Sequence, residues 1–204
     1  YWVKSDNGEI LSVVGEKQYN TSYNLHFGNN LISYTCDESA MVEDLVVNPE
    51  ITSIIGEGVA TTYDSNLGWL GSLTTLDPGK GYWFKSNSDT SLDYDCPSQE
   101  ADDLSSREVV PPIGDYAQST QQAFYFFGDV EGIEAGDIVR AYYNDNLIGA
   151  RAWFGAYSDV PAMGLDFQDA TQGYAQEGSS LRFTLQKQGD DEMELSGNFP
   201  LWSG

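Results

Sequence analysis

The same short motif occurs twice in this sequence. Residues 1–6 read Tyr-Trp-Val-Lys-Ser-Asp, and residues 82–87 read Tyr-Trp-Phe-Lys-Ser-Asn. Repetition of this kind is typical of tandem arrays, in which each copy is one structural unit. We therefore expect residues 1–17 to be the tail of a preceding module, left over as an N-terminal strand, and residues 18–97 to be a complete module. Arrays usually span, cover or adhere, whereas an enzyme needs one converging site.

The spacing of turns predicts an all-β chain. Gly occurs 21 times, and with Asn, Asp and Ser it separates short aromatic and β-branched runs, while helical periodicity is almost absent. Hairpins are predicted over residues 51–63, 137–154 and 181–195. One short helix is expected within residues 38–47, where Met41 and Leu45 have helical spacing. The expected fold is two consecutive β-sandwich-like domains.

The composition changes between the two predicted domains. Residues 98–121 are acidic and Ser-rich and contain Pro111 and Pro112, which predicts a linker with an edge strand near residues 109–113. A companion β-sandwich domain is expected over residues 122–204. A length of 204 residues fits two domains of roughly 100 residues each.

The charge balance limits the classes of partner. The chain has 9 Lys and Arg against 32 Asp and Glu, a formal net charge of -23. Such a surface repels phosphate backbones and anionic lipids, so no nucleic-acid partner is expected. Apolar stretches stay well short of the roughly 18 residues that a membrane span requires, so no membrane insertion is expected either. Plain solubility is the simplest explanation of the acidic surface.

The two cysteines, Cys36 and Cys96, lie near the beginning and the end of the predicted complete module. Strands that open and close a sandwich often lie side by side, so a disulfide between them is expected. Closing a loop of this length stabilises the fold by roughly 4 kcal/mol in the chain-entropy model. The alternative is two unrelated buried thiols.

The sequence gives little support for a catalytic site or a structural zinc site. The chain contains one imidazole, His26, on the polar face of a predicted strand, and no Gly-x-Ser-x-Gly elbow surrounds a serine. We expect His26 to be a surface residue and the chain not to be an enzyme. Two cysteines and one histidine do not supply a standard structural zinc site.

Calcium is the one cofactor that the acidic residues suggest. Hard cations need several oxygen ligands, which a loop can supply. The candidates are Asp89, Asp93 and Asp95, of which the last two share a strand face, and separately Asp166 with Asp169. Neither group matches a known calcium-loop motif, and solvated turns are the alternative.

Aromatic side chains suggest a second kind of site. Flat exposed rings beside polar groups can stack on sugars, and the candidates are Tyr63 with Trp69, and Trp153 with Tyr157. The alternative is that Trp153 and Trp83, which lie in strong strand patterns, are core anchors.

Arg151 alternates with Trp153 along the same predicted strand. We expect it to be an internal partner for Asp137 or Asp159 rather than a ligand contact.

Several motifs resemble a β-module of large secreted or surface proteins of aquatic bacteria, which also occurs in predicted structural proteins of marine phages. Residues 27–33, 54–58, 69–73 and 78–83 carry this resemblance, the last through Pro-Gly-Lys-Gly-Tyr-Trp. Residues 122–126, 136–139, 149–153 and 159–164 are similar to a companion domain of the same proteins. The companion domains usually have an acidic turn with glycine after the Met-Gly pair, but residues 165–169 depart from it, which puts a cation at that turn in doubt.

The resemblance implies no assigned catalytic residue and a location outside the cell, on a cell surface or on a virion surface. We expect a non-catalytic structural or adhesive segment of a larger protein, whose partners are other copies or neighbouring modules of the same assembly. Its edge strands would pair with a neighbour by strand complementation. The alternative is a carbohydrate-binding module that recognises surface glycans.

Overall fold

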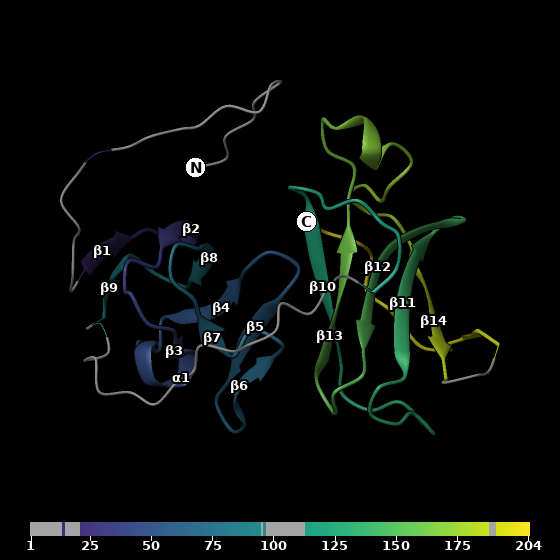
Figure 1. Cartoon of the computed structure of the whole chain (residues 1–204), viewed down its shortest axis with the longest axis horizontal. Coiled ribbons are helices and arrows are strands. Elements are labelled where there is room, and N and C mark those ends of the chain that lie inside the picture. The colour runs from purple at the N-terminus through teal and green to yellow at the C-terminus, as the bar shows by residue number, and fades with distance from the viewer. Residues whose placement is uncertain (1–13, 15–20, 95, 97–112, 188–190) are drawn as a thin grey trace.

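A computed structural model describes residue 14 and residues 21–94, 96, 113–187 and 191–204. The fold is nearly all β, as predicted (Figure 1). Its buried apolar side chains form two clusters, one within residues 25–92 and one within residues 125–202. We call residues 21–96 the N-terminal unit and residues 113–204 the C-terminal unit. The predicted module tail at residues 1–17, apart from Val14, and the predicted edge strand, apart from Ile113, lie outside the described residues.

The main sheet of the N-terminal unit is antiparallel, with the strand order β2-β8-β4-β5-β6. Its strands are β2 (Gly28–Ser33), β4 (Ile51–Ile55), β5 (Ala60–Asp64), β6 (Gly68–Gly71) and β8 (Gly81–Ser86). The strand β8 lies between two neighbours and alternates strictly. Tyr82, Phe84 and Ser86 are buried, whereas Trp83 and Lys85 face outward.

Two short strand pairs and one helical turn complete the N-terminal unit. The pairs are β1 (Thr21–Leu25) with β9 (Thr90–Tyr94), and β3 (Ala40–Met41) with β7 (Thr75–Leu76). The helix α1 (Val42–Leu45) follows β3 directly. The helix predicted within residues 38–47 is therefore confirmed for a single turn only, because residues 40 and 41 pair with β7 instead.

The predicted disulfide is confirmed. Cys36 follows β2, Cys96 follows β9, and the two are bonded with their Cα atoms 5.2 Å apart. The bond closes the N-terminal unit on itself.

The C-terminal unit contains a four-stranded sheet in the order β12-β11-β14-β15 and a pair of strands, β10-β13. Their bounds are β10 (Gln122–Phe127), β11 (Ile138–Tyr143), β12 (Asn146–Ala152), β13 (Ser158–Met163), β14 (Arg182–Gln186) and β15 (Met193–Glu194). A single 3-10 turn, η1 (Asp169–Thr171), follows β13. The hairpins predicted over residues 137–154 and 181–195 are confirmed as β11-β12 and β14-β15.

The strands of the C-terminal unit roll around one core. β13 lies alongside β12, so the order around the core is β10, β13, β12, β11, β14 and β15. Among the described residues, β10 forms no strand pair with β14 or β15, so the roll does not close into a barrel on that side. Phe199 fills part of this opening, with its ring centroid 4.7 Å from that of Phe183 and 5.9 Å from that of Phe127.

Neither helix in the described part of the chain has the length and apolar character that crossing a membrane requires.

Candidate functional site

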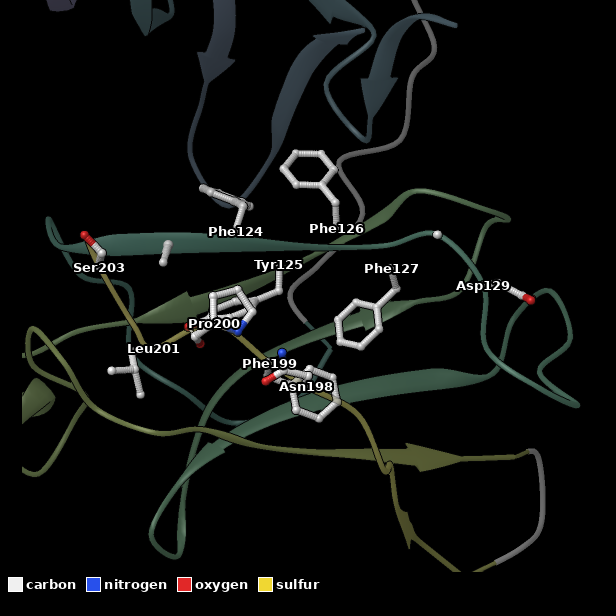
Figure 2. Close-up of a pocket in the computed structure, with 12 residues that line it drawn as sticks. Phe124, Tyr125, Phe126, Phe127, Asp129, Asn198, Phe199, Pro200, Leu201 and Ser203 are labelled. Carbon is white, nitrogen blue, oxygen red and sulfur yellow. Dashed lines mark hydrogen bonds between the residues drawn. The ribbon is translucent and has the colours of Figure 1, made fainter.

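The strand β10 meets the N-terminal unit with one face and the core with the other. Figure 2 shows Phe124 and Phe126 pointing toward the N-terminal unit, while Tyr125 and Phe127 point into the C-terminal unit. The last two are buried and the first two are half-buried. Residues 124–127 therefore contribute side chains both to the core of the C-terminal unit and to the contact between the two units, which we call the junction.

A groove of about 460 Å³ follows β10 along its length. One wall is formed by residues 123–129, and the other by residues 198–201 and 203 near the C-terminal end of the described chain. Within the described residues, β10 is hydrogen-bonded to β13 alone. The groove therefore lies at the edge of β10 that has no strand partner there.

A buried tyrosine joins the two walls. The Tyr125 hydroxyl donates to the carbonyl oxygen of Pro200 at 3.3 Å. Burial raises the pKa of Tyr125 to about 12, so the hydroxyl keeps its proton at neutral pH and remains a donor.

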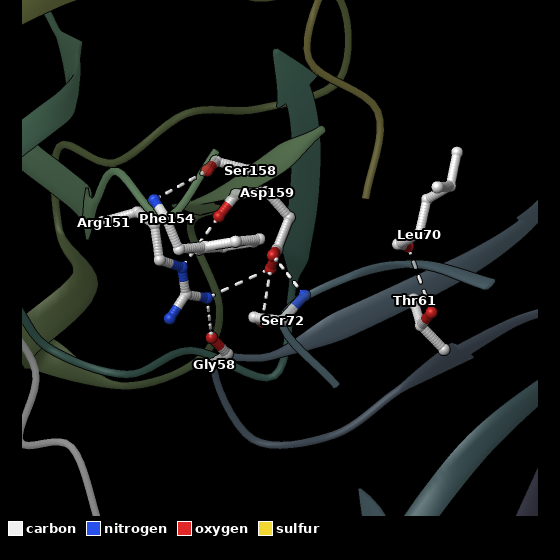
Figure 3. A network of polar contacts seen from close by, with 8 residues as sticks. All are labelled: Gly58, Thr61, Leu70, Ser72, Arg151, Phe154, Ser158 and Asp159. Atoms are coloured by element: carbon white, nitrogen blue, oxygen red, sulfur yellow. Dashed lines mark hydrogen bonds and ion pairs between the residues drawn. The ribbon is translucent and has the colours of Figure 1, made fainter. Parts of the chain in front are cut away.

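Hydrogen bonds from the ion pair of Arg151 and Asp159, which both belong to the C-terminal unit, hold the two units together (Figure 3). Asp159, on β13, is fully buried, and its carboxylate accepts hydrogen bonds from the Ser72 backbone N–H at 2.7 Å and the Ser72 hydroxyl at 2.8 Å. Ser72 directly follows β6 in the N-terminal unit. Arg151, on β12, donates from Nη2 to the same carboxylate at 3.1 Å.

The Arg151 guanidinium also spans the junction. Its Nε donates to the Asp159 carbonyl oxygen at 2.8 Å, and its Nη2 donates to the Gly58 carbonyl oxygen of the N-terminal unit at 2.5 Å. The predicted internal role of Arg151 is confirmed with Asp159 as the partner. Asp137 is not that partner in the structure, since its carboxylate accepts from the Glu134 backbone N–H.

The electrostatics of Asp159 reflect this environment. Burial raises the pKa of Asp159, while the Arg151 charge and the Ser72 hydrogen bonds act in the opposite direction. Removing one partner of a buried ion pair typically costs about 3–5 kcal/mol, because the remaining charge is left uncompensated. All the groups in this network are engaged with one another, so the network is suited to positioning.

Close packing accompanies the ion pair. Gly71 has a φ of 130°, which favours glycine, and a Cβ atom there would collide with the Ala60 carbonyl and press on the Phe126 ring. The chain therefore reaches Ser72 through a position that tolerates no side chain.

The structure separates the predicted aromatic candidates. Tyr63 and Trp69 are cross-strand neighbours with ring centroids 5.3 Å apart, and Tyr63 is 45% exposed. Tyr157 is 37% exposed, but Trp153 is only 7% exposed and belongs to the core. A platform role for Trp153 is therefore wrong and its core-anchor role is confirmed.

Trp83 is not a core anchor, contrary to the sequence-based expectation. It is 40% exposed on the outer face of β8. Its cross-strand neighbours are Leu31 on β2 and Ile55 on β4. Of the four residues that residues 82–86 share with residues 1–5, Tyr82 and Ser86 are buried, whereas Trp83 and Lys85 face outward. Core packing therefore explains only half of the repeated motif.

Asp166 uses its carboxylate to hold a loop. Its two oxygens accept five hydrogen bonds, from the backbone N–H and the side chain of both Thr120 and Gln168, and from the Thr171 hydroxyl. These donors outweigh the opposing effect of desolvation and lower the pKa of Asp166.

The other calcium candidates differ in their placement. Asp169 lines the same pocket as Asp166. Asp169 is exposed, Asp93 accepts a hydrogen bond from Ser91, and Asp95 lies outside the described residues. Among the described residues, no three His, Cys, Asp or Glu side chains converge as metal ligands would. Calcium binding stays a prediction for both groups of candidates.

His26 is exposed, as predicted, with its Nδ1 atom 2.7 Å from the Phe27 carbonyl oxygen.

The chain matches no protein-family model, no curated protein and no solved structure. The resemblance to surface modules therefore stays a prediction.

The residues that sequence reasoning missed are Ser72 and Gly58, which contribute a hydroxyl and backbone groups to the junction. Serine and glycine in turns give no pattern that would have indicated this.

Proposed function

We propose that this chain is a non-catalytic structural segment of a larger extracellular or virion-surface assembly, which acts through protein interfaces. The observation that carries the proposal is the buried ion pair between Arg151 and Asp159, which is bonded to both units. A flexible tether between two domains needs no buried charge at their contact. A segment that must hold a fixed angle benefits from one, because the Asp159 carboxylate and the Arg151 guanidinium reach Ser72 and Gly58 in one arrangement of the units only.

The disulfide supports a location outside the reducing cytosol. The net charge of -23 disfavours nucleic acid and anionic membranes as partners. Interfaces with other proteins therefore fit the charge and the architecture better than contacts with nucleic acid or anionic membranes do.

Nitrogen-15 relaxation of the full chain tests the proposal. We expect the two units to tumble with one correlation time, because the junction makes them a single body. Asp159→Asn should give the units separate correlation times or a broader small-angle scattering envelope. Asp145→Asn, in the exposed β11-β12 turn, is the matched control and should leave both measurements unchanged. Independent tumbling of the unmodified units would contradict the proposal.

A carbohydrate-binding module is the second candidate function. The specific observation in its favour is the exposed Trp83, which lies beside Lys85 on an open sheet face. A flat indole on such a face can stack on a sugar ring, while nearby polar groups bond its hydroxyls.

A glycan array tests this second function. Binding that is lost in Trp83→Ala or Tyr63→Ala, with unchanged circular dichroism, would support it. Phe154→Ala, which removes an exposed ring from the C-terminal unit, serves as the control. An array on which the unmodified chain binds no glycan would argue against this candidate.

A further inference from the structure

We infer that the free edge of β10 pairs with the β10 edge of a second copy of this chain, as two antiparallel strands about a twofold axis. This inference rests on the proposed structural role and names the partner of one of its surfaces. It is carried by the backbone of β10, by the groove beside that strand and by the distribution of charge.

Along β10, a row of backbone donors and acceptors has no partner among the residues that the structure describes. In an antiparallel pair, every second residue turns its N–H and C=O toward the partner strand. Gly164 donates to the Gln121 carbonyl and Tyr157 donates to the Phe127 carbonyl, so the odd-numbered residues face β13. Gln122, Phe124 and Phe126 therefore turn their N–H and C=O groups toward the groove.

The edge is exposed to strand addition. A strand without a neighbour is a template for another chain unless it is short, charged, bulged or covered. β10 is six residues long, carries no charged side chain and pairs regularly with β13. Residues 198–201 and 203 line the groove, but they form no strand with β10. Within the described residues, this edge therefore has no charge, no bulge and no strand partner, and the loop at its side leaves the groove open.

The charge distribution favours a second copy as the occupant. A twofold contact brings identical surfaces together, so a charged patch would meet its own sign. The chain carries a net charge of -23, yet residues 116–128 and 195–204, which contain nearly all of both walls, have no Asp, Glu, Lys or Arg. Asp129 is the one ionic residue that lines the groove. The groove is thus a place where two such acidic chains can meet without opposing carboxylates.

The side chains of β10 are compatible with themselves. Antiparallel self-pairing sets an uncharged, aromatic strand against an identical one, and aromatic cross-strand pairs stabilise sheets. The resulting sheet would run β13-β10-β10-β13 across the axis and would satisfy the row of backbone groups at Gln122, Phe124 and Phe126.

Amide hydrogen exchange of the full chain, followed from dilute to concentrated protein, tests the inference without a substitution. In the dimer, the amides of Phe124 and Phe126 should exchange at least tenfold more slowly than in the dilute monomer. The Tyr125 amide faces β13 and should be protected at both concentrations, which makes it an internal control. A dimer in which the Phe124 and Phe126 amides remain unprotected would overturn the proposed contact.

Sedimentation analysis with charged variants provides the second test. Leu201 lines the groove and is 61% exposed, whereas Leu67 lies in the β5-β6 loop and is 56% exposed. Leu201→Glu should weaken dimerisation at least tenfold, because it puts a carboxylate into the uncharged groove that the second copy would occupy. Leu67→Glu adds the same charge elsewhere and should change it less than twofold.

Two results would overturn the inference: a chain that stays monomeric up to about 1 mM, or a dimer that Leu201→Glu leaves intact. A monomer whose two units tumble as one body would overturn the dimer but leave the proposed structural function in place. Independent tumbling of the units would instead contradict the function itself.

Discussion

Asp166 stabilises the loop after β13 through five hydrogen bonds to its carboxylate and one from its backbone N–H to the Thr171 hydroxyl. Its partners come from Thr120 before β10, and from Gln168 and Thr171 next to η1. One side chain thus joins two segments that are 46 residues apart in the sequence.

We predict that Asp166→Asn lowers the free energy of unfolding by about 1–3 kcal/mol at pH 7, because hydrogen bonds to a charged acceptor are lost. Denaturant titration of both proteins measures the difference. Asp169→Asn, on the same loop but exposed, is the control and should change stability by less than about 0.5 kcal/mol. Equal losses in the two variants would argue against the hydrogen-bond explanation.

The same comparison has a defined pH dependence. The pKa of Asp166 is lower in the folded chain than in the unfolded chain, so its stabilising contribution is present above the unfolded pKa of about 4. That contribution decreases as the pH falls from about 4 toward the folded pKa. The difference between the unmodified chain and Asp166→Asn should therefore narrow in acid, and a constant difference would contradict the assignment.

The contact between β12 and β13 depends on one glycine. A Cβ atom on Gly149 would overlap the Pro161 carbonyl, whereas a Cβ atom on Gly81, at the start of β8, would meet its nearest neighbours at 3.7 Å. Neither glycine has a positive φ, so backbone strain does not distinguish them.

We predict that Gly149→Ala destabilises the fold by about 1–3 kcal/mol or more, because β12 and β13 must move apart. Gly81→Ala is the matched control and should be close to neutral. Thermal unfolding followed by circular dichroism measures both. A neutral Gly149→Ala would show that β12 and β13 lie farther apart than the structure places them.

Turn chemistry made the hairpins predictable from sequence. The turn at Asn144 and Asp145 separates two apolar runs, and β11 and β12 form on either side of it, with Asn144 at a positive φ of 53°.

Trp83 could not be placed correctly, because strict alternation in a strand shows that two faces exist but not which one is buried. In β8 both faces carry large aromatic side chains, since Tyr82 and Phe84 point inward and Trp83 points outward.

The site was predictable only where it involved nearby residues. Arg151 and Asp159 are eight positions apart, and their pairing was one of two expected outcomes. Ser72 is 87 positions from Asp159, and no local pattern connects them. The free edge of β10 is likewise a property of the strand order, which a single sequence does not determine.

At the scale of the whole molecule, the disulfide contributes to the stability of the N-terminal unit by closing a long loop of the chain. Reduction, or Cys36→Ser with Cys96→Ser, should lower the free energy of unfolding of this unit by about 4 kcal/mol in the chain-entropy model. Denaturation of the oxidised and reduced chains measures it. A loss below about 1 kcal/mol would mean that the unfolded unit is already compact.

The bond between Cys36 and Cys96 also sets a mechanical limit. When the chain is stretched from its two ends, tension passes directly through the sulfur atoms and bypasses the 60-residue loop that they close. About 200 Å of contour length therefore stays hidden in the oxidised chain, and optical-tweezer traces should recover it only after a reductant is added. Under shear or flow, the oxidised chain would therefore extend by a short, bounded length.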